Sequence, residues 1–321
     1  MEHGSLTPLS SSALLIGRDA LLAIWKSRDP RLDPVDALIL STVVHANVDP
    51  LTSGLHEQME FGALDHPPPG ELRRRVSINR VADSLDLRFE TVRRRIKRLE
   101  SLGLMETCRT GALVPEHYFH TESNRLAVQG LDAAAAATFR RLDAIGFFEL
   151  HPLPEPVALP PEHPYRAVAR LFMTYALRLG GEMRLLAGDF PNLLLMLQLT
   201  QMNTRDRNDD RDPATTGLGG PLVPDDRKEP ASISALSRAC RIPFETTRRR
   251  LSRMEQAGLC RMVGGGYVAP MEVIAQFALR LAPGNDMNLV RLYRACAQLG
   301  AIEGWRRGRT FTETAGHRLA S

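Results

Sequence analysis

The chain has 321 residues, of which 43% are hydrophobic and 24% charged, so it can bury a core in roughly two domains of ordinary size. Its formal charge of +4 is too small to indicate a nucleic-acid partner by itself. The four cysteines lack the spacing of a zinc site, and the longest apolar run near the middle, LLLML from Leu193, is too short to span a bilayer. We therefore expect a cytoplasmic protein without metal or other cofactor.

The first half predicts helices before a polar loop. ALLIGRDALLAIWKS from Ala13 has helical apolar spacing, and PVDALILSTVVHANV from Pro34 predicts a second helix with proline in its first turn. A long polar loop is expected from Asp49 to Glu71. The sequence SINRVADSLDLRFETVRRRIKRLESLGL from Ser77 then predicts two short helices joined by a turn.

A hairpin and a long helix are predicted to complete this half. METCRTGALVP from Met105 reads as two short strands with Gly111 at the turn. TESNRLAVQGLDAAAAATFRRLDAIG from Thr121 predicts the helix. The segment HPLPEPVALPPEHP, residues 151–164, contains six prolines and favours an extended linker. We expect a first domain over residues 1–150 and a second over residues 165–321.

The second half predicts the same order of elements. Helices are expected from Tyr165 and Asp189, and a polar loop from Thr204 to Glu229. The acidic part of this loop, TRDRNDDRDP, lacks the glycine and terminal glutamate of a calcium-binding EF-hand loop. A hairpin is predicted from Cys260, and a helix from Met271 that breaks at Pro283 and Gly284.

The two halves share a segment that aligns without a gap. SISALSRACRIPFETTRRRLSRMEQAGL from Ser232 matches the segment from Ser77 at 12 of 28 positions. Average composition gives roughly two identities by chance, so the sequence indicates an internal duplication. Both copies contain FET, one variable residue and then RRR.

Helical spacing separates two faces on each arginine-rich helix. Phe89, Val92, Ile96 and Leu99 fall on one narrow arc, which predicts a buried stripe. In the second copy, the stripe is predicted to contain Phe244, Leu251 and Met254, with Thr247 in place of Val92.

The opposite face carries the residue types that read DNA. Arginine can bond in a fork to guanine and glutamate can accept from cytosine, so Arg94, Glu90, Arg249 and Glu245 are expected to face bases. The flanking arginines are expected to contact phosphates. The full candidate DNA-binding set is Glu90, Thr91, Arg93, Arg94, Arg95, Lys97, Arg98, Arg109, Glu245, Thr246, Arg248, Arg249, Arg250, Arg253 and Arg261.

Two interpretations of the basic residues stay open at this point. A glutamate and an arginine four residues apart can simply pair on a solvated helix face, as Glu90 and Arg94 could. Arg73, Arg74 and Arg75 lie just before the first copy and read either as extra phosphate contacts or as a solvated basic loop.

Each copy resembles the winged helix-turn-helix of bacterial transcription regulators of the MarR, GntR and IclR kind. The resemblance rests on SINRVADSLDL with RFETVRRRIKRLESLGL, and on SISALSRACRI with PFETTRRRLSRMEQAGL. It implies a mainly α fold with small β-hairpin wings, in which the helices beginning near Arg88 and Pro243 read double-stranded DNA. The hairpins around Arg109 and Gly265 are the implied wings, and the flanking helices make MarR the nearest of the three.

The expected function is sequence-specific DNA binding by a transcription regulator, with two recognition helices from one chain acting as a pseudo-dimer in the bacterial cytoplasm. An enzyme is not expected, because no nucleotide-binding or hydrolase motif occurs in the sequence. Two alternatives remain, a plasmid-type replication initiator and a winged-helix module that binds protein. A homodimer of the tandem chain and a small-molecule effector are left open.

Overall fold

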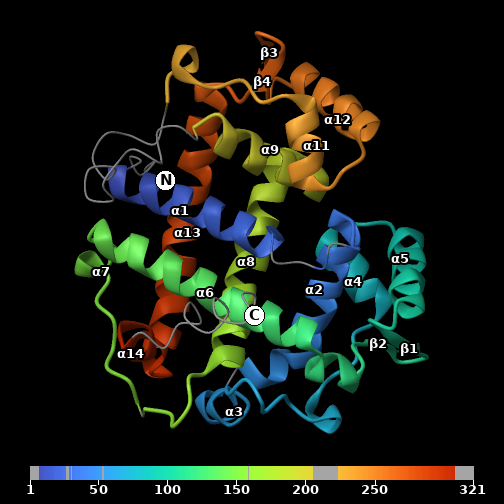
Figure 1. Ribbon diagram of the computed structural model, residues 1–321, viewed down its shortest axis with the longest axis vertical. Helices are drawn as coiled ribbons and strands as arrows, with labels where there is room; N and C mark the ends of the chain where they lie inside the picture. Colours follow the sequence, from blue (N-terminus) through green and yellow to red (C-terminus); the bar gives the residue numbers. More distant parts are fainter. Residues whose placement is uncertain are drawn as a thin grey trace, which may run out of the picture. The chain divides into compact units, whose positions relative to one another are not determined.

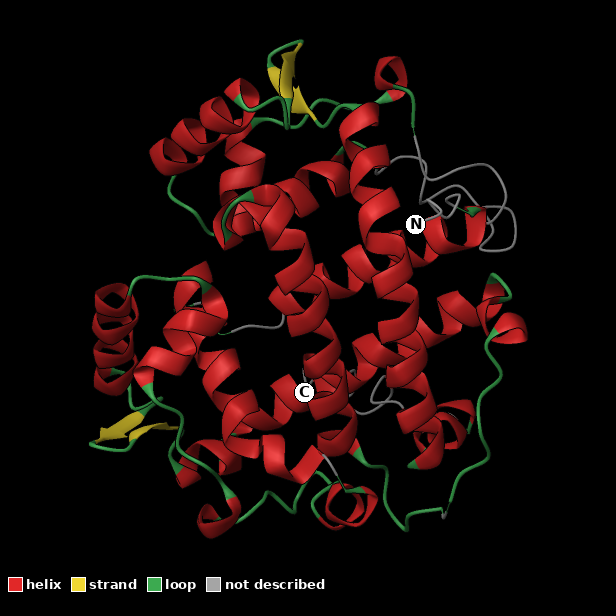
Figure 2. Ribbon diagram, turned by 180° about the vertical axis from the view of Figure 1, so that it is seen from behind, coloured by secondary structure: helices red, strands yellow, loops and turns green. Residues whose placement is uncertain are grey.

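The computed structural model describes residues 7–26, 29, 31–52, 54–157, 159–204 and 223–307. In these residues the fold is mainly helical, with two small antiparallel hairpins, as Figures 1 and 2 show. Both features agree with the predicted fold class. None of the helices described is at once long enough and apolar enough to cross a membrane.

The first half follows the predicted order of helices and strands. The polar loop predicted from Asp49 to Glu71 is more ordered than expected, because it contains a short α-helix and single turns of 3₁₀-helix. The elements are α1 (Pro8–Lys26), α2 (Pro34–Val48), η1 (Asp49–Thr52), α3 (Leu55–Glu60), η2 (Gly70–Leu72), α4 (Ile78–Leu85), α5 (Phe89–Ser101), β1 (Glu106–Cys108), β2 (Gly111–Leu113), η3 (Glu116–His120), α6 (Glu122–Ala144) and α7 (Phe147–Leu150).

The second half contains the corresponding series. Residues 205–222 of its predicted loop, including most of the acidic stretch, lie outside the described residues. The elements are α8 (Tyr165–Ala187), α9 (Phe190–Met202), η4 (Asp225–Arg227), α11 (Ile233–Cys240), α12 (Phe244–Gln256), β3 (Arg261–Val263), β4 (Gly266–Val268), α13 (Met271–Gln298) and α14 (Ala301–Arg306).

The predicted break in the last long helix is wrong. Helix α13 continues through Pro283 and Gly284 without interruption. Proline in a helix removes one backbone donor and costs about 3 kcal/mol, which packing can offset. Here Ala282 on one side is 2% exposed and Asn285 on the other is fully buried, so the segment is held by its surroundings.

The chain forms two compact units that do not follow the two sequence halves. Unit 1 comprises Met1–Lys26, Arg140–His151 and Arg178–Val290. Unit 2 comprises Ser27–Phe139, Pro152–Leu177 and Arg291–Ser321. Each unit therefore combines residues from the expected domains 1–150 and 165–321, and α6, α8 and α13 each contribute residues to both units.

Unit 2 holds the first arginine-rich helix. Helices α4 and α5 pack against α2, and β2 also contacts α2 (Figure 1). Val43 of α2, Val81 of α4 and Val92 of α5 are all fully buried where these helices meet. This small apolar core fixes the position of α5 relative to the helix before it.

Unit 1 holds the second arginine-rich helix in a similar setting. Helix α11 packs against both α9 and α12, and α9 also packs against α1 (Figure 1). Leu199, Leu236 and Leu251 are fully buried in this core. Helix α1 belongs to the first half of the sequence, so the apolar surface that covers α9 is supplied from the far end of the chain.

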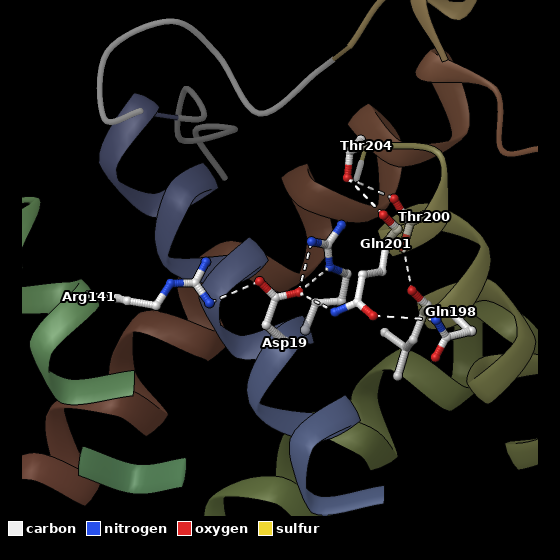
Figure 3. Close-up of polar contacts among 8 residues, drawn as sticks. Asp19, Arg141, Gln198, Thr200, Gln201 and Thr204 are labelled. Carbon is white, nitrogen blue, oxygen red and sulfur yellow. Dashed lines mark hydrogen bonds and ion pairs between the residues drawn. The ribbon is translucent and has the colours of Figure 1, made fainter. Parts of the chain in front are cut away.

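Asp19 joins the three stretches of unit 1. Its carboxylate on α1 accepts hydrogen bonds from Arg141 of α6 at 2.9 Å and from Gln201 of α9 at 3.3 Å (Figure 3). The neighbouring Arg18 also donates to it at 2.8 Å. Burial opposes ionisation of Asp19, but the two arginines hold the pKa of its carboxyl below the ordinary value.

Candidate nucleic-acid interface

Both arginine-rich helices follow the same kind of turn. Ser77 caps α4 by accepting a hydrogen bond from a first-turn amide at 3.2 Å, and Asp86 ends the helix in the left-handed region with a φ of 52°. Ser232 caps α11 at the same distance, and Arg241 ends it with a φ of 51°. The chain therefore enters α5 and α12 from matching local geometries.

Most of the predicted inner stripe is buried. Val92 and Leu99 are fully buried on α5, and Leu251 is fully buried on α12. Thr247, which replaces the valine, is also fully buried, and its hydroxyl donates to the carbonyl of Ile242 at 3.2 Å. This hydrogen bond lets a polar side chain occupy the apolar stripe without an unsatisfied group.

The predicted burial of two phenylalanines is wrong. Phe89 is 41% exposed and Phe244 is 47% exposed. Each is the first residue of its helix, so no earlier turn of that helix shelters the ring. Helical spacing gives the direction of a side chain but does not show where the covering surface ends.

The outer faces carry exposed cations. Arg94 and Lys97 on α5, and Arg249 and Arg253 on α12, are exposed. Among the residues that the structure describes, none of these four side chains has a hydrogen-bond or ion-pair partner. The candidate threonines, Thr91 and Thr246, are half-buried at the edge of the same faces.

Each outer face also carries one glutamate–arginine pair. Glu90 pairs with Arg93 at 2.8 Å, and Glu245 pairs with Arg248 at 2.9 Å. The alternative expected from the sequence joined Glu90 to Arg94, but the structure uses the residue three positions away. All four paired side chains are substantially exposed, and such surface pairs contribute roughly 0–1 kcal/mol. A phosphate can therefore replace the glutamate at little cost.

Arg95 and Arg98 both form ion pairs with the beginning of α2, although 50% of the Arg98 side chain stays exposed, compared with 22% for Arg95. Arg95 donates to Asp33 and, at 2.8 Å, to Asp36, while Arg98 donates to Asp36 at 2.7 Å. The side chain of Asp36 is fully buried. Burial opposes ionisation of Asp33, but the hydrogen bond from Arg95 leads the contributions that keep its pKa below the ordinary value. Arg95, which was expected to contact phosphate, is thus bound by carboxylates of the protein.

Arg250 occupies the corresponding position on α12. Its guanidinium donates to the N-cap residue Asp189 at 2.7 Å and to Asn192 at 2.8 Å, both at the beginning of α9. Only 26% of its side chain is exposed. Like Arg95, it therefore anchors its helix to the preceding one and does not face outward as the sequence predicted.

The two hairpins differ in the charge that they offer. In the first, Arg109 lies exposed at the turn between β1 and β2. In the second, Arg261 of β3 is half-exposed and pairs with Asp225. Met262 beside it is 54% exposed and Val263 is 42% exposed, so the strand of the second hairpin presents an apolar surface.

Two buried asparagines at the C-terminal ends of α2 and α9 fasten the hairpins, a role that was not predicted from the sequence. The Asn47 side chain donates to the carbonyls of Arg74 and Ala112 and accepts from the Val114 amide, at 2.7, 3.3 and 2.9 Å. Asn203 makes the same three bonds at the matched positions of the second half, at 2.6, 3.1 and 3.0 Å. A polar residue at the end of an apolar helix was the only available signal.

Arg73 fits neither interpretation made from the sequence. It is 7% exposed, donates to the Val114 carbonyl at 2.8 Å and lies 4.8 Å from the ring centroid of Phe119. At the matched position, Lys228 donates to the carbonyl of Ala269. Both cations hold the chain that leaves the hairpin, so Arg73 is not available to phosphate.

Gly111 is required by the close approach of the hairpin to the chain before α4. A Cβ atom on this residue would lie 2.3 Å from the carbonyl oxygen of Val76, and the φ of 132° is itself unfavourable for other residues. We expect Gly111→Ala to lower the free energy of unfolding by about 2 kcal/mol or more. Chemical denaturation followed by circular dichroism measures this change.

Gly103→Ala is the matched control for that substitution. Its φ of 70° is also positive, but no atom lies within 4 Å of the added Cβ. Backbone strain alone costs about 1 kcal/mol. Equal decreases in the free energy of unfolding for Gly103→Ala and Gly111→Ala would mean that the hairpin can move away from Val76 without a further loss of stability.

Comparisons with known proteins assign no family to this chain. No protein-family model, curated protein or solved structure matches the chain. In the described residues no group of three or more His, Cys, Asp or Glu side chains could hold a metal ion. The two arginine-rich helices and their surroundings are therefore the features that bear on function.

Proposed function

We propose that this protein binds double-stranded DNA sequence-specifically as a transcription regulator, using α5 and α12 as two recognition helices. One observation carries the proposal: each helix buries an apolar stripe and turns two exposed cations outward without a carboxylate partner in the described residues. These cations are Arg94 and Lys97 on α5, and Arg249 and Arg253 on α12. A helix anchored in this way can enter a major groove as a rigid body.

We infer that both motifs are winged helix-turn-helices produced by duplication. Each comprises a short helix, a tight turn, a helix of 13 residues and a two-stranded hairpin. The matched bonds of Asn47 and Asn203 support a common origin, because the same asparagine fastens the same three points of the backbone. The anchors made by Arg95 and Arg250 support it in the same way.

The contacts of each side chain suggest its role on DNA. Arg94 and Arg249 point away from the buried stripes and are suited to the acceptors of guanine. Arg93 and Arg248 can exchange their glutamate partners for phosphate, and this would also free Glu90 and Glu245 to accept from cytosine. Arg95 and Arg250 are left out of the proposed DNA contacts, because carboxylates of the protein already bind them.

The proposed arrangement also has consequences for the whole chain. A chain with two recognition helices can bind two half-sites without a second subunit, whereas most regulators obtain two helices by dimerising. The two helices differ at Lys97 and Ser252 and at Arg88 and Pro243, so the half-sites should be related but unequal. We place this activity in the bacterial cytoplasm and propose no catalytic step or cofactor.

Arginine substitutions test the two recognition helices directly. A duplex is first selected from a random pool with the full chain, and its affinity is then measured by mobility shift for Arg94→Ala and Arg249→Ala. Loss of one base-reading arginine is expected to cost roughly 1–3 kcal/mol, or roughly 5- to 150-fold in affinity. The loss should be greatest against the selected bases and smaller against duplexes altered at the contacted positions.

Arg280→Ala and Arg291→Ala are matched controls, because they remove the same charge from exposed positions of α13. They should leave the affinity within about twofold. If Arg94→Ala and Arg249→Ala also change it by no more than this, α5 and α12 are not recognition helices. Selected sites in tandem direct repeats near an origin would instead favour a replication initiator.

A further inference from the structure

Arg98 and Arg253 occupy matched positions on the two arginine-rich helices but have different surroundings. Each lies four residues after the central arginine, Arg94 or Arg249, and about 40° around the helix from it. Arg98 is held by the buried carboxylate of Asp36 at 2.7 Å. Arg253 is exposed and has no ion-pair partner in the described part of the chain.

The difference begins at one residue of the preceding helix. Asp36 in the first turn of α2 corresponds to Asn192 in the first turn of α9, because both lie three residues after the N-cap. The Asp36 carboxylate offers one oxygen to Arg95 and the other to Arg98. Asn192 has a single side-chain oxygen, which accepts from Arg250, while its amide nitrogen donates to the Ala187 carbonyl.

A carboxylate can therefore bind two arginines where an amide binds one. Asp36 also carries a charge that attracts the second guanidinium, and its complete burial strengthens that attraction. Asn192 offers neither a second oxygen nor a charge. This explains why the arginine is ion-paired on α5 but not on α12, although both side chains are exposed.

We propose that Asp36 and Asn192 determine whether the arginine four residues after the central arginine, Arg98 on α5 or Arg253 on α12, is available to DNA phosphate. This inference rests on the proposed function. On α5, Arg98 is ion-paired with Asp36 although its side chain is 50% exposed, and Lys97 is exposed without a partner in the described residues, about 60° from Arg94 on the flank of Arg93. On α12, Ser252 stands in place of the lysine and Arg253 is exposed on the opposite flank.

A helix in the major groove faces one phosphate backbone on each side. The second cation of α5 therefore faces one wall of the groove, and the second cation of α12 faces the other wall. The two copies then differ in which DNA phosphate backbone their second cation contacts, in addition to the bases that they contact. The difference at Arg98 and Arg253 thus arises from a pair of residues that touch no DNA.

The salt dependence of DNA binding tests this proposal, because each phosphate contact contributes about 0.9 to the slope of log affinity against log salt. Arg253→Ala should reduce the magnitude of the slope by about 0.9, whereas Arg98→Ala should leave it unchanged. Asp36→Asn should raise the magnitude of the slope by about 0.9, because it releases Arg98 from its ion pair. Asn192→Asp should lower the magnitude, because the new carboxylate can form an ion pair with Arg253. All are measured with the full chain on the selected duplex.

The double variant Asp36→Asn with Arg98→Ala is the decisive control, because it should return to the wild-type slope. Asparagine already serves at the matched position of α9, and circular dichroism checks that Asp36→Asn folds. If that variant does not fold, the single substitutions Arg98→Ala and Arg253→Ala at exposed positions still decide the question. Equal effects of these two on the slope would overturn the inference.

The proposed function and this inference are tested by different pairs of variants. If Arg94→Ala and Arg249→Ala do not weaken binding, the assignment of recognition helices is lost. If those two weaken binding as expected but Arg98→Ala and Arg253→Ala act alike, only the role of Asp36 and Asn192 is lost. The two results are therefore distinguishable in one set of titrations.

Discussion

The affinity of the full chain for its selected duplex is expected to fall roughly 500-fold when monovalent salt rises fourfold, from about 50 to about 200 mM. Five cations of the proposed DNA-binding set are exposed, are not assigned to bases and are not paired with a carboxylate that is buried or mostly buried, and at about 0.9 per phosphate they give a slope of about −4.5. They are Arg93, Lys97, Arg109, Arg248 and Arg253. Fluorescence anisotropy of the labelled duplex at four salt concentrations gives the slope.

This measurement separates DNA binding from the alternative of a protein-interaction module. An interface made mainly of apolar contacts changes little over the same salt range, since no condensed counterions are released. Arg280→Ala and Arg291→Ala should keep the wild-type slope, because their positions on α13 are not among the five cations. A slope near zero with the selected duplex would exclude phosphate neutralisation by α5 and α12.

The second large effect is expected from Trp25→Ala, which should lower the free energy of unfolding of unit 1 by about 3–5 kcal/mol. Trp25 is 5% exposed at the end of α1. Its indole nitrogen donates to the carbonyl of Ala239 at 3.2 Å, and the Arg241 guanidinium lies 5.5 Å from the ring centroid. The substitution removes a large buried ring and leaves a carbonyl at the end of α11 without this partner.

Hydrogen exchange locates this loss within the chain. The amides of α11 and α12 should exchange faster in Trp25→Ala, although Ala239 lies 214 residues away in sequence. The amides of α4 and α5 belong to unit 2 and should change less. Equal acceleration in both pairs of helices would contradict the assignment of α1 to unit 1.

The other tryptophan provides a matched control in the other unit. Trp305 is 4% exposed, and its indole nitrogen donates to Asp132 at 3.1 Å, with both residues in unit 2. Trp305→Ala should therefore accelerate exchange first in unit 2. Because the chain has two tryptophans, Trp25→Phe and Trp305→Phe also leave one fluorescent reporter for the unfolding of each unit.

The same organisation indicates how the two proposed recognition helices depend on the chain as a whole. Helix α12 is in unit 1, whose core includes α1 from the other half of the sequence. A substitution that weakens the packing of α1 should thus impair the proposed DNA contacts of Arg249 more than those of Arg94. A fragment of residues 165–321 alone would lack the helix that covers α9.

The amino-acid sequence was sufficient to predict most of the longer helices, both hairpins and most of the inner stripes of the arginine-rich helices. These features follow from local spacing: Val92 and Leu99 lie on one side of α5 because a helix turns about 100° per residue. Matched turn residues made both hairpins predictable for the same reason. Each of these predictions concerns residues that are close together in the chain.

Only the tertiary structure decided which surfaces those elements meet. Helical spacing places Arg95 and Arg98 beside Arg94, but it does not show that Asp36 lies within reach of the first two. It also does not show that Trp25 meets Ala239 or that Asn47 fastens a hairpin. A local pattern gives the direction of a side chain, whereas its partner depends on how distant segments pack, and here that packing selects the arginines that remain exposed.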